Sequence, residues 1–214
     1  MKKLLYATVV VVIVGFAGHA LVMRGMEVEA GDENVQARNE ELLMAAQNND
    51  EPGVEQALAD GADVNAQNEN NWSALMKAAR NNNANIVRIL ARERPAEINA
   101  NLQGNAGETA LMLAAQYGNL DLIEALLGVP RINVNIRDRF DSDALTMAVS
   151  QMPHDVSIVQ ALVNAEADTA RALVQMDRFY AINVPDQNEQ QLRRWNDRLD
   201  RIYFVLTGRQ HGDA

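Results

Sequence analysis

Residues 109–127 read TALMLAAQYGNLDLIEALL, and this stretch decides the fold. Thr109 opens a run of apolar and small residues, and a second apolar run begins at Leu120. Between them lies Gly118, which can adopt a positive φ and so end a helix at little cost. Two short helices joined by a tight turn are therefore predicted.

The same pattern occurs four times along the chain. Its first halves are EELLMAA at 40–46, SALMKAA at 73–79, TALMLAA at 109–115 and DALTMAV at 143–149. The matching leucines, by subtraction 33, 36 and 34 residues apart, are Leu42, Leu75, Leu111 and Leu145. A period in the low thirties is typical of a solenoid of stacked helix pairs. The sequence therefore predicts an all-α array.

These residues resemble the ankyrin repeat family. The resemblance rests on residues 109–115 with 118–123, and on GADVNA at 61–66, which is similar to the family's usual repeat ending. It covers residues 37–170, in units of about 37–69, 70–104, 105–139 and 140–170. It implies an ankyrin-type helix-turn-helix solenoid with short β-turn or hairpin fingers, which binds another protein and is not an enzyme.

The chain departs from the family at two positions of each unit. Where the family favours proline, the chain has Glu41, Ala74, Ala110 and Ala144. Where it favours histidine, the chain has Leu43, Met76, Met112 and Thr146. Since the family's histidine helps to join adjacent repeats by hydrogen bonding, we expect apolar packing to do more of that work here.

Residues 171–214 do not form a clean repeat and are predicted to be a helical cap with a loose tail. Apolar residues recur there every three or four positions, at Leu192, Trp195, Leu199, Ile202 and Leu206. A final helix pair of this kind would cover the core face that the last repeat otherwise exposes. Trp195 is expected to pack in the cap rather than to bind a ligand.

The first 24 residues are predicted to be a signal anchor or a signal peptide. Lys2 and Lys3 precede an apolar stretch, 4–23, that is long enough to cross a membrane as a hydrophobic helix. The lysines should stay in the cytoplasm, which places the repeats on the exported, periplasmic side. Small residues at 15–20 would suit a signal peptidase, whereas the valine-rich run slightly favours a retained anchor. Residues 25–36 are expected to be an acidic tether.

Composition limits the choice of partner. The chain of 214 residues has a net charge of −10, which disfavours nucleic acid and would suit a basic protein, although acidity also serves solubility. It has no cysteine, so disulfides and thiolate metal sites are excluded. No cofactor, metal or small-molecule substrate is expected.

Catalytic patterns are weak. The one plausible pair is His154 with Asp155, in a loop that more often forms a solvated turn than half of a catalytic site. The chain has no phosphate-binding Gly-Lys-Ser/Thr loop and no nucleophile elbow. A hydrolase that uses carboxylates or His154 stays as one alternative, and a purely structural envelope spacer as another.

The resemblance also places the candidate binding residues. It puts Trp72 and Glu108 in exposed finger positions, where Trp72 either anchors a partner or folds back onto the neighbouring finger. Large aromatic residues are favoured anchors at interfaces. An accessory role towards an exported enzyme or toxin is one possibility for such a module. The predicted partner-binding residues are Trp72, Arg80, Asn81, Glu108, Tyr117, Arg139 and Phe140.

Overall fold

The computed structural model describes residues 19–150, 156–182, 197 and 200–208. Within these residues the chain is helical, and its β-structure is a single isolated antiparallel bridge between Gln67 and Ser73. The prediction of an all-α fold is therefore confirmed for the described part of the chain.

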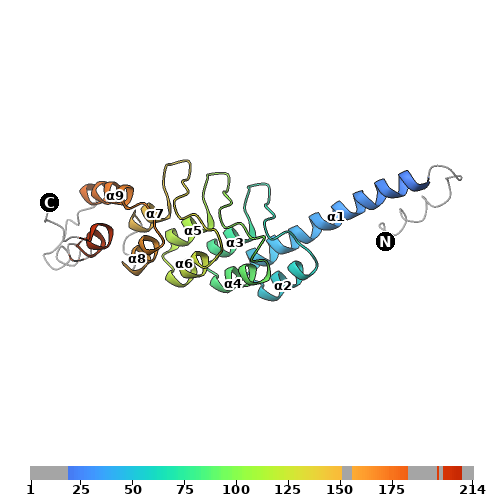
Figure 1. Ribbon diagram of the computed structural model, residues 1–214, viewed down its shortest axis with the longest axis horizontal. Coiled ribbons are helices and arrows are strands. Elements are labelled where there is room, and N and C mark those ends of the chain that lie inside the picture. Colours follow the sequence, from blue (N-terminus) through green and yellow to red (C-terminus); the bar gives the residue numbers. More distant parts are fainter. Residues whose placement is uncertain (1–18, 151–155, 183–196, 198–199, 209–214) are drawn as a thin grey trace.

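The described helices form two stacked rows (Figure 1). The inner row lies next to the fingers and consists of α1 (His19–Asn48), α3 (Ala74–Arg80), α5 (Ala110–Tyr117), α7 (Ala144–Ser150) and α9 (Thr169–Ile182). The outer row consists of α2 (Glu51–Ala59), α4 (Ala84–Glu93), α6 (Leu120–Leu127) and α8 (Val156–Asn164). Each helix packs on the next member of its own row, which is the solenoid arrangement that the repeat period predicts.

Local sequence sets where the helices begin and end. The Thr109 hydroxyl accepts a hydrogen bond from the Met112 amide (3.3 Å) and caps α5, and Asn119 caps α6 through the amide of Leu122 (3.3 Å). Gly118 adopts φ 71° between the two helices. Gly118 thus ends α5 as the sequence predicts, whereas Asn49 and Asn82 adopt the positive φ at the matching turns of the first two units.

Apolar burial joins the repeats. The matching leucines Leu42, Leu75, Leu111 and Leu145 are all buried. At the positions where the family favours histidine, Met76 and Met112 are also buried, so apolar side chains occupy that place in the core. Ala78 and Ala114 have no exposed surface, which fits helices that approach closely because methyl side chains separate them.

Three asparagines, one in each of the first three units, form hydrogen bonds to the backbone of the next unit. These contacts were not predicted from the sequence. Asn101 donates from Nδ2 to the carbonyl of Arg131 (2.8 Å), and its Oδ1 accepts from the amide of Asn133 (2.7 Å). Asn65 and Asn135 each make the same pair of bonds to the unit after their own. We call Asn65, Asn101 and Asn135 the asparagine ladder.

Three fingers project beside the inner row (Figure 1). Each is closed by a backbone hydrogen bond, from Asn68 to Trp72 (3.1 Å), Gly104 to Glu108 (2.9 Å) and Asp138 to Ser142 (2.9 Å). The Asn105 amide donates to the carbonyl of Asn70 (3.2 Å), and the Arg139 amide donates to that of Ala106 (3.0 Å). These bonds join neighbouring fingers, so the finger edge is fixed relative to the helices.

The N-terminal part differs from the tether that the sequence analysis expected. Residues 25–36 belong to α1, one helix that continues into the first repeat and extends beyond the array (Figure 1). The stretch has few apolar groups, but it has no proline and includes the helix-forming residues Glu, Met, Ala and Gln. These helix-forming residues account for the helix, which a low apolar content does not exclude.

Among the described residues, no helix combines the length and the apolar character needed to cross a membrane. Most of the predicted membrane segment, residues 4–18, lies outside the described part of the chain.

At the other end, α9 packs on α7 as α7 packs on α5, and so continues the inner row. Its Ala172 and Met176 are fully buried. Residues 200–207 are helical and contribute buried Ile202 and Leu206 to the same core. Trp195 and the start of the predicted second cap helix lie outside the described residues, so the cap stays a prediction.

Candidate protein-binding surface

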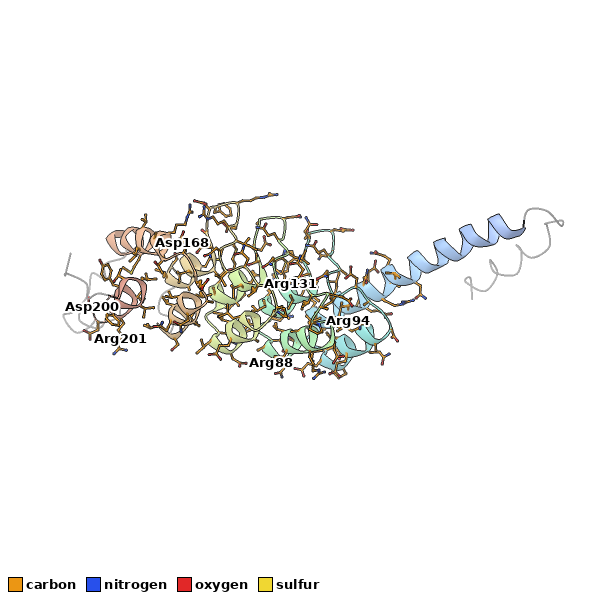
Figure 2. The ribbon with its side chains drawn as sticks, in the orientation of Figure 1. Arg88, Arg94, Arg131, Asp168, Asp200 and Arg201 are labelled. Carbon is orange, nitrogen blue, oxygen red and sulfur yellow. The ribbon has the colours of Figure 1, made fainter. Side chains whose placement is uncertain are left out.

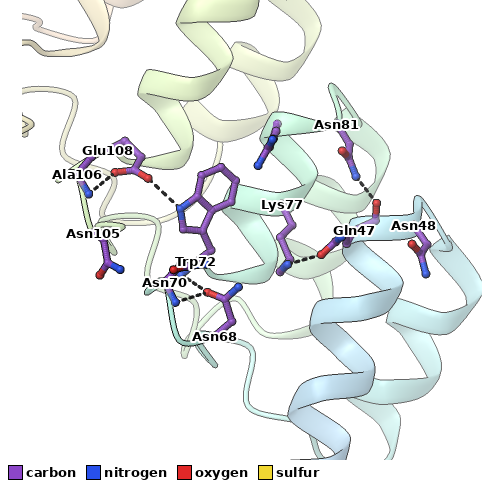
Figure 3. Close-up of a pocket in the computed structure, with 11 residues that line it drawn as sticks. Gln47, Asn48, Asn68, Asn70, Trp72, Lys77, Asn81, Asn105, Ala106 and Glu108 are labelled. Carbon is purple, nitrogen blue, oxygen red and sulfur yellow. Dashed lines mark hydrogen bonds between the residues drawn. The ribbon is translucent and has the colours of Figure 1, made fainter.

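A hollow of about 670 Å³ opens between the first two fingers and the inner row (Figure 3). Three consecutive units contribute to it: the end of α1, helix α3 with its first finger, and the second finger. We call it the Trp72 hollow. Its lining residues are Gln47, Asn48, Asn68, Asn70, Trp72, Lys77, Arg80, Asn81, Asn105, Ala106 and Glu108.

Trp72 is half-buried and packs against the core of the array. Its Nε1 donates a hydrogen bond to Glu108 Oε1 on the next finger (2.8 Å; Figure 3). The guanidinium carbon of Arg80 lies 5.1 Å from the centre of the indole ring, within the range of a cation–π contact. Trp72 therefore folds onto the neighbouring finger, which was one of the two alternatives, and the ring also lines the hollow.

Glu108 fixes the indole from the other side. Its second oxygen, Oε2, accepts a hydrogen bond from the amide of Ala106 (2.9 Å), so both oxygens are engaged within the second finger and with Trp72. A carboxylate with two donors is held in one orientation. These contacts consequently hold the indole in one position.

Lys77 and Arg80 place two cations in the hollow from the same face of α3. Lys77 Nζ donates to Gln47 Oε1 at the end of α1 (2.6 Å), which is a neutral acceptor (Figure 3). Partial burial lowers the pKa of Lys77 below its usual value, and the nearby charge of Arg80 lowers it further. The two cations therefore repel each other in a partly desolvated place.

This repulsion predicts a stability change. A folded-state pKa below the unfolded value means that the unfolded chain binds more protons between the two values, so stability rises with pH as it approaches 10.5. At pH 7 the charged Lys77 therefore opposes folding. Lys77→Met should leave the free energy of unfolding unchanged or raise it by up to about 0.5 kcal/mol.

Urea denaturation at pH 7 and at pH 9.5 measures this effect, and the gap between Lys77→Met and the natural chain should narrow at the higher pH. Arg88→Met on α4 is the control, because Arg88 is ion-paired with Asp121 and the partner raises its pKa. A loss of more than 1 kcal/mol in Lys77→Met would show that the contact to Gln47 outweighs the repulsion.

The structure divides the predicted patch. Trp72, Arg80, Asn81 and Glu108 come together in the Trp72 hollow. Tyr117 is exposed at the end of α5 and does not line this hollow. Arg139 and Phe140 lie on the third finger, where Phe140 is 81% exposed. The binding of a partner by these residues stays a prediction.

Phe140 lines a second hollow, of about 600 Å³, beside α9. There the Asp141 carboxylate pairs with both Arg171 and Arg137, and the Arg171 guanidinium holds the pKa of Asp141 below its usual range. These charges largely satisfy one another, in contrast to the cations of the Trp72 hollow.

Sequence reasoning missed Lys77. The signal was present: Lys77 and Arg80 are three residues apart, so they share one face of a helix. The amides of Asn68 and Asn105 were also missed, because only the folded fingers bring these loop residues beside α3.

His154 and Asp155, the residues of the alternative hydrolase, lie outside the described residues. In the part of the chain that the structure describes, no group of three His, Cys, Asp or Glu side chains is placed to hold a metal ion.

Comparison with known proteins identifies the repeats. The family model "Ankyrin repeats (3 copies)" matches residues 42–138 and 96–172. The chain is 38% identical over 96 residues to alpha-latrotoxin-Lg1a of Latrodectus geometricus, which is 44% of this chain and 7% of that protein. It is 47% identical over 49 residues to the human mitochondrial disaggregase, 23% of this chain and 7% of that protein. The likeness thus spans a small part of each relative.

Proposed function

The chain belongs to the ankyrin repeat family, whose repeats bind other proteins, and we propose that it captures its partner in the Trp72 hollow on the exported side of a membrane. The module acts by binding and leaves chemistry to its partner. That partner is an exported enzyme or toxin, which the module sequesters or assists.

The observation that supports this proposal most strongly is the fixed indole in an open hollow. Trp72 is held by Glu108 and covered on one side by Arg80, while the surrounding positions are polar and accessible. Tryptophan and arginine are the side chains that most often supply binding energy at interfaces, above all where they are pre-positioned. Neutral amides around them offer donors and acceptors that fit the peptide groups of a partner.

The export part of the proposal is supported by the sequence of the first 36 residues. Lys2 and Lys3 precede the apolar stretch 4–23, and acidic residues such as Glu27 and Asp32 come after it. This charge order favours retention of the N-terminus in the cytoplasm and translocation of the repeats.

The binding surface is tested by site-specific cross-linking in the cell. A photoreactive benzoylphenylalanine at Asn70, which lines the hollow, should cross-link one protein in near-stoichiometric amount. The same group at Asn85, exposed on α4 of the outer row, is the matched control and should not. Cross-linking at Asn85 alone would move the interface to the outer row, and no cross-link at either site would favour the structural spacer.

Trp72→Ala should weaken binding of the cross-linked partner by about thirtyfold, which corresponds to about 2 kcal/mol for the loss of a hot-spot aromatic. Trp72→Phe keeps an aromatic ring but loses the bond to Glu108. We expect its affinity to lie between those of the natural chain and Trp72→Ala. Affinity is measured by titration with the purified partner, and circular dichroism checks that the helices persist. Equal affinity of Trp72→Ala and the natural chain would contradict the assignment of the hollow.

Export is tested by fusing alkaline phosphatase after Ala214, because this reporter needs disulfides and so becomes active only on the exported side. Full activity is expected, and Lys2→Glu combined with Lys3→Glu should reduce it. An inactive fusion that is present at normal abundance would refute the export proposal and leave the binding surface unaffected.

A further inference from the structure

We propose that the Trp72 hollow recognises an acidic side chain, Asp or Glu, on an extended segment of the partner, with its carboxylate bound between Lys77 and Arg80. This inference rests on the proposed binding function and names the chemistry of the partner at that site. The net charge of −10 suggests a basic partner, whereas at this hollow we expect the bound group to be acidic.

The hollow contains more positive than negative side chains. Among its lining residues the charged side chains are Lys77, Arg80 and Glu108, and the other polar ones are neutral amides. Both oxygens of Glu108 are already engaged by Trp72 and Ala106. No ion pair in the described structure involves Lys77 or Arg80, and these two positive charges face the single negative charge of Glu108, so the lining of the hollow has an excess of one positive charge.

Among the four units, only the second has this pair of cations. Counted from the matching leucines, the position of Lys77 is Met44, Leu113 or Met147 in the other units, and that of Arg80 is Gln47, Gln116 or Ser150. All six replacements are uncharged. If these positions served only solubility, we would expect similar charges at the matching positions of the other units. A pair of cations in one unit only is instead typical of a site for an anion.

Lys77, Arg80 and Trp72 also lie close enough together to contact one side chain of a partner. On a helix, residues three apart lie next to each other, so Lys77 and Arg80 can contact the same anion. Arg80 also lies over the indole of Trp72, so the ring and the guanidinium are neighbours in the hollow. An Asp or Glu side chain has an apolar stem for the ring and a carboxylate for the cations.

The pKa of Lys77 agrees with this arrangement. Burial and the charge of Arg80 lower the pKa of Lys77, as expected for a partly buried cation without an ion-pair partner among the described residues. A bound carboxylate would remove the repulsion and favour the ammonium form. The binding energy then includes relief of a destabilising contact as well as a new ion pair.

A peptide carboxylate fits the hollow better than a nucleic-acid phosphate. A polyanion needs a run of cations along its backbone, and the whole chain carries an excess of acidic groups that repels it. A single carboxylate needs only the two cations present. The side-chain amides of Asn48 and Asn70, which also line the hollow, can pair with the peptide groups that flank an acidic residue.

The experiment is a selection from a displayed library of random twelve-residue peptides, on the full chain immobilised in mild detergent. Peptides recovered by the natural chain, and lost with Trp72→Ala, should be enriched in Asp and Glu. A selected acidic peptide should bind Lys77→Gln/Arg80→Gln about tenfold to a hundredfold more weakly, as expected for lost hydrogen bonds between charged groups. Its affinity for the natural chain should fall as salt is raised.

The matched control is Arg88→Gln/Arg92→Gln. It removes the same two positive charges from α4, the outer helix of the same unit, where both arginines are paired with exposed carboxylates. Arg88 lies on the side of the array away from the fingers (Figure 2). This variant should bind the acidic peptide with unchanged affinity, which separates a local site from a general effect of net charge.

The outcomes distinguish the inference from the function on which it rests. Trp72-dependent peptides without acidic enrichment, or equal binding by Lys77→Gln/Arg80→Gln, would overturn the acidic partner and leave the protein-binding function intact. Equal or tighter binding of a single-stranded oligonucleotide at the same cations would also overturn it. If no recovered peptide depends on Trp72, the function and the inference both fail.

Discussion

Simultaneous replacement of Asn65, Asn101 and Asn135 with alanine is expected to lower the free energy of unfolding by about 3–6 kcal/mol. Each side chain makes two hydrogen bonds to the backbone of the next unit, with lengths between 2.7 and 3.1 Å. These bonds are exposed, so each is expected to contribute about 0.5–1 kcal/mol net, in the lower part of the usual range, and six are lost. Chemical denaturation followed by circular dichroism measures the change.

The pattern of the loss is as informative as its size. The asparagine ladder joins units to each other, whereas bonds inside a unit remain in the triple variant. Because a solenoid is stabilised by the interfaces between neighbours, weakening all of them should broaden the transition and lower its apparent m value. If the three asparagines act independently, each single replacement should lower the free energy of unfolding by about a third of the total.

A suitable control replaces Asn85, Gln116 and Asn164 with alanine. These side chains are exposed polar groups, and in the described structure none of them bonds to another unit. That triple variant should change stability by less than about 1 kcal/mol. If the ladder variant behaves in the same way, solvent must replace its bonds at no cost, and apolar packing alone would couple the repeats.

The ladder shows where sequence reasoning stopped. The period, the helix pairs and the buried leucines all follow from the spacing of apolar and small residues, because a helix imposes its own periodicity on burial. The sequence also placed Met76 and Met112 inside the core. The asparagines of the polar returns recur with the same period, but their partners are backbone groups about thirty residues away. Sequence alone does not reveal such partners.

The candidate site was partly predictable for the same reason. The family resemblance located Trp72, Arg80, Asn81 and Glu108, and these four share one hollow. It could not show that Phe140 faces a different hollow, because the finger and α9 meet only in the folded array. Nor could it show that Glu108 is bonded to Trp72 and Ala106 and, in the described structure, forms no ion pair with Lys77 or Arg80.

The second large effect is expected for Leu111→Ala, which should lower the free energy of unfolding by about 3–4 kcal/mol. Leu111 is 2% exposed in α5, and α5 packs between α3 and α7 at the middle of the inner row. Removing a buried leucine side chain loses its transfer energy and leaves a cavity, which together cost about 2–5 kcal/mol. Alanine favours a helix at least as well as leucine, so the loss reports packing and not helix propensity.

Met44→Ala is the matched control for Leu111→Ala, because Met44 lies two residues after the matching leucine of the first unit and is 61% exposed. It should change the free energy of unfolding by less than about 0.5 kcal/mol. Because Leu111 lies in a central unit, its loss weakens the interface on each side, and the two ends of the array should then melt at different denaturant concentrations. A loss below about 1 kcal/mol, with a single sharp transition, would mean that α5 is not the packed centre of the stack.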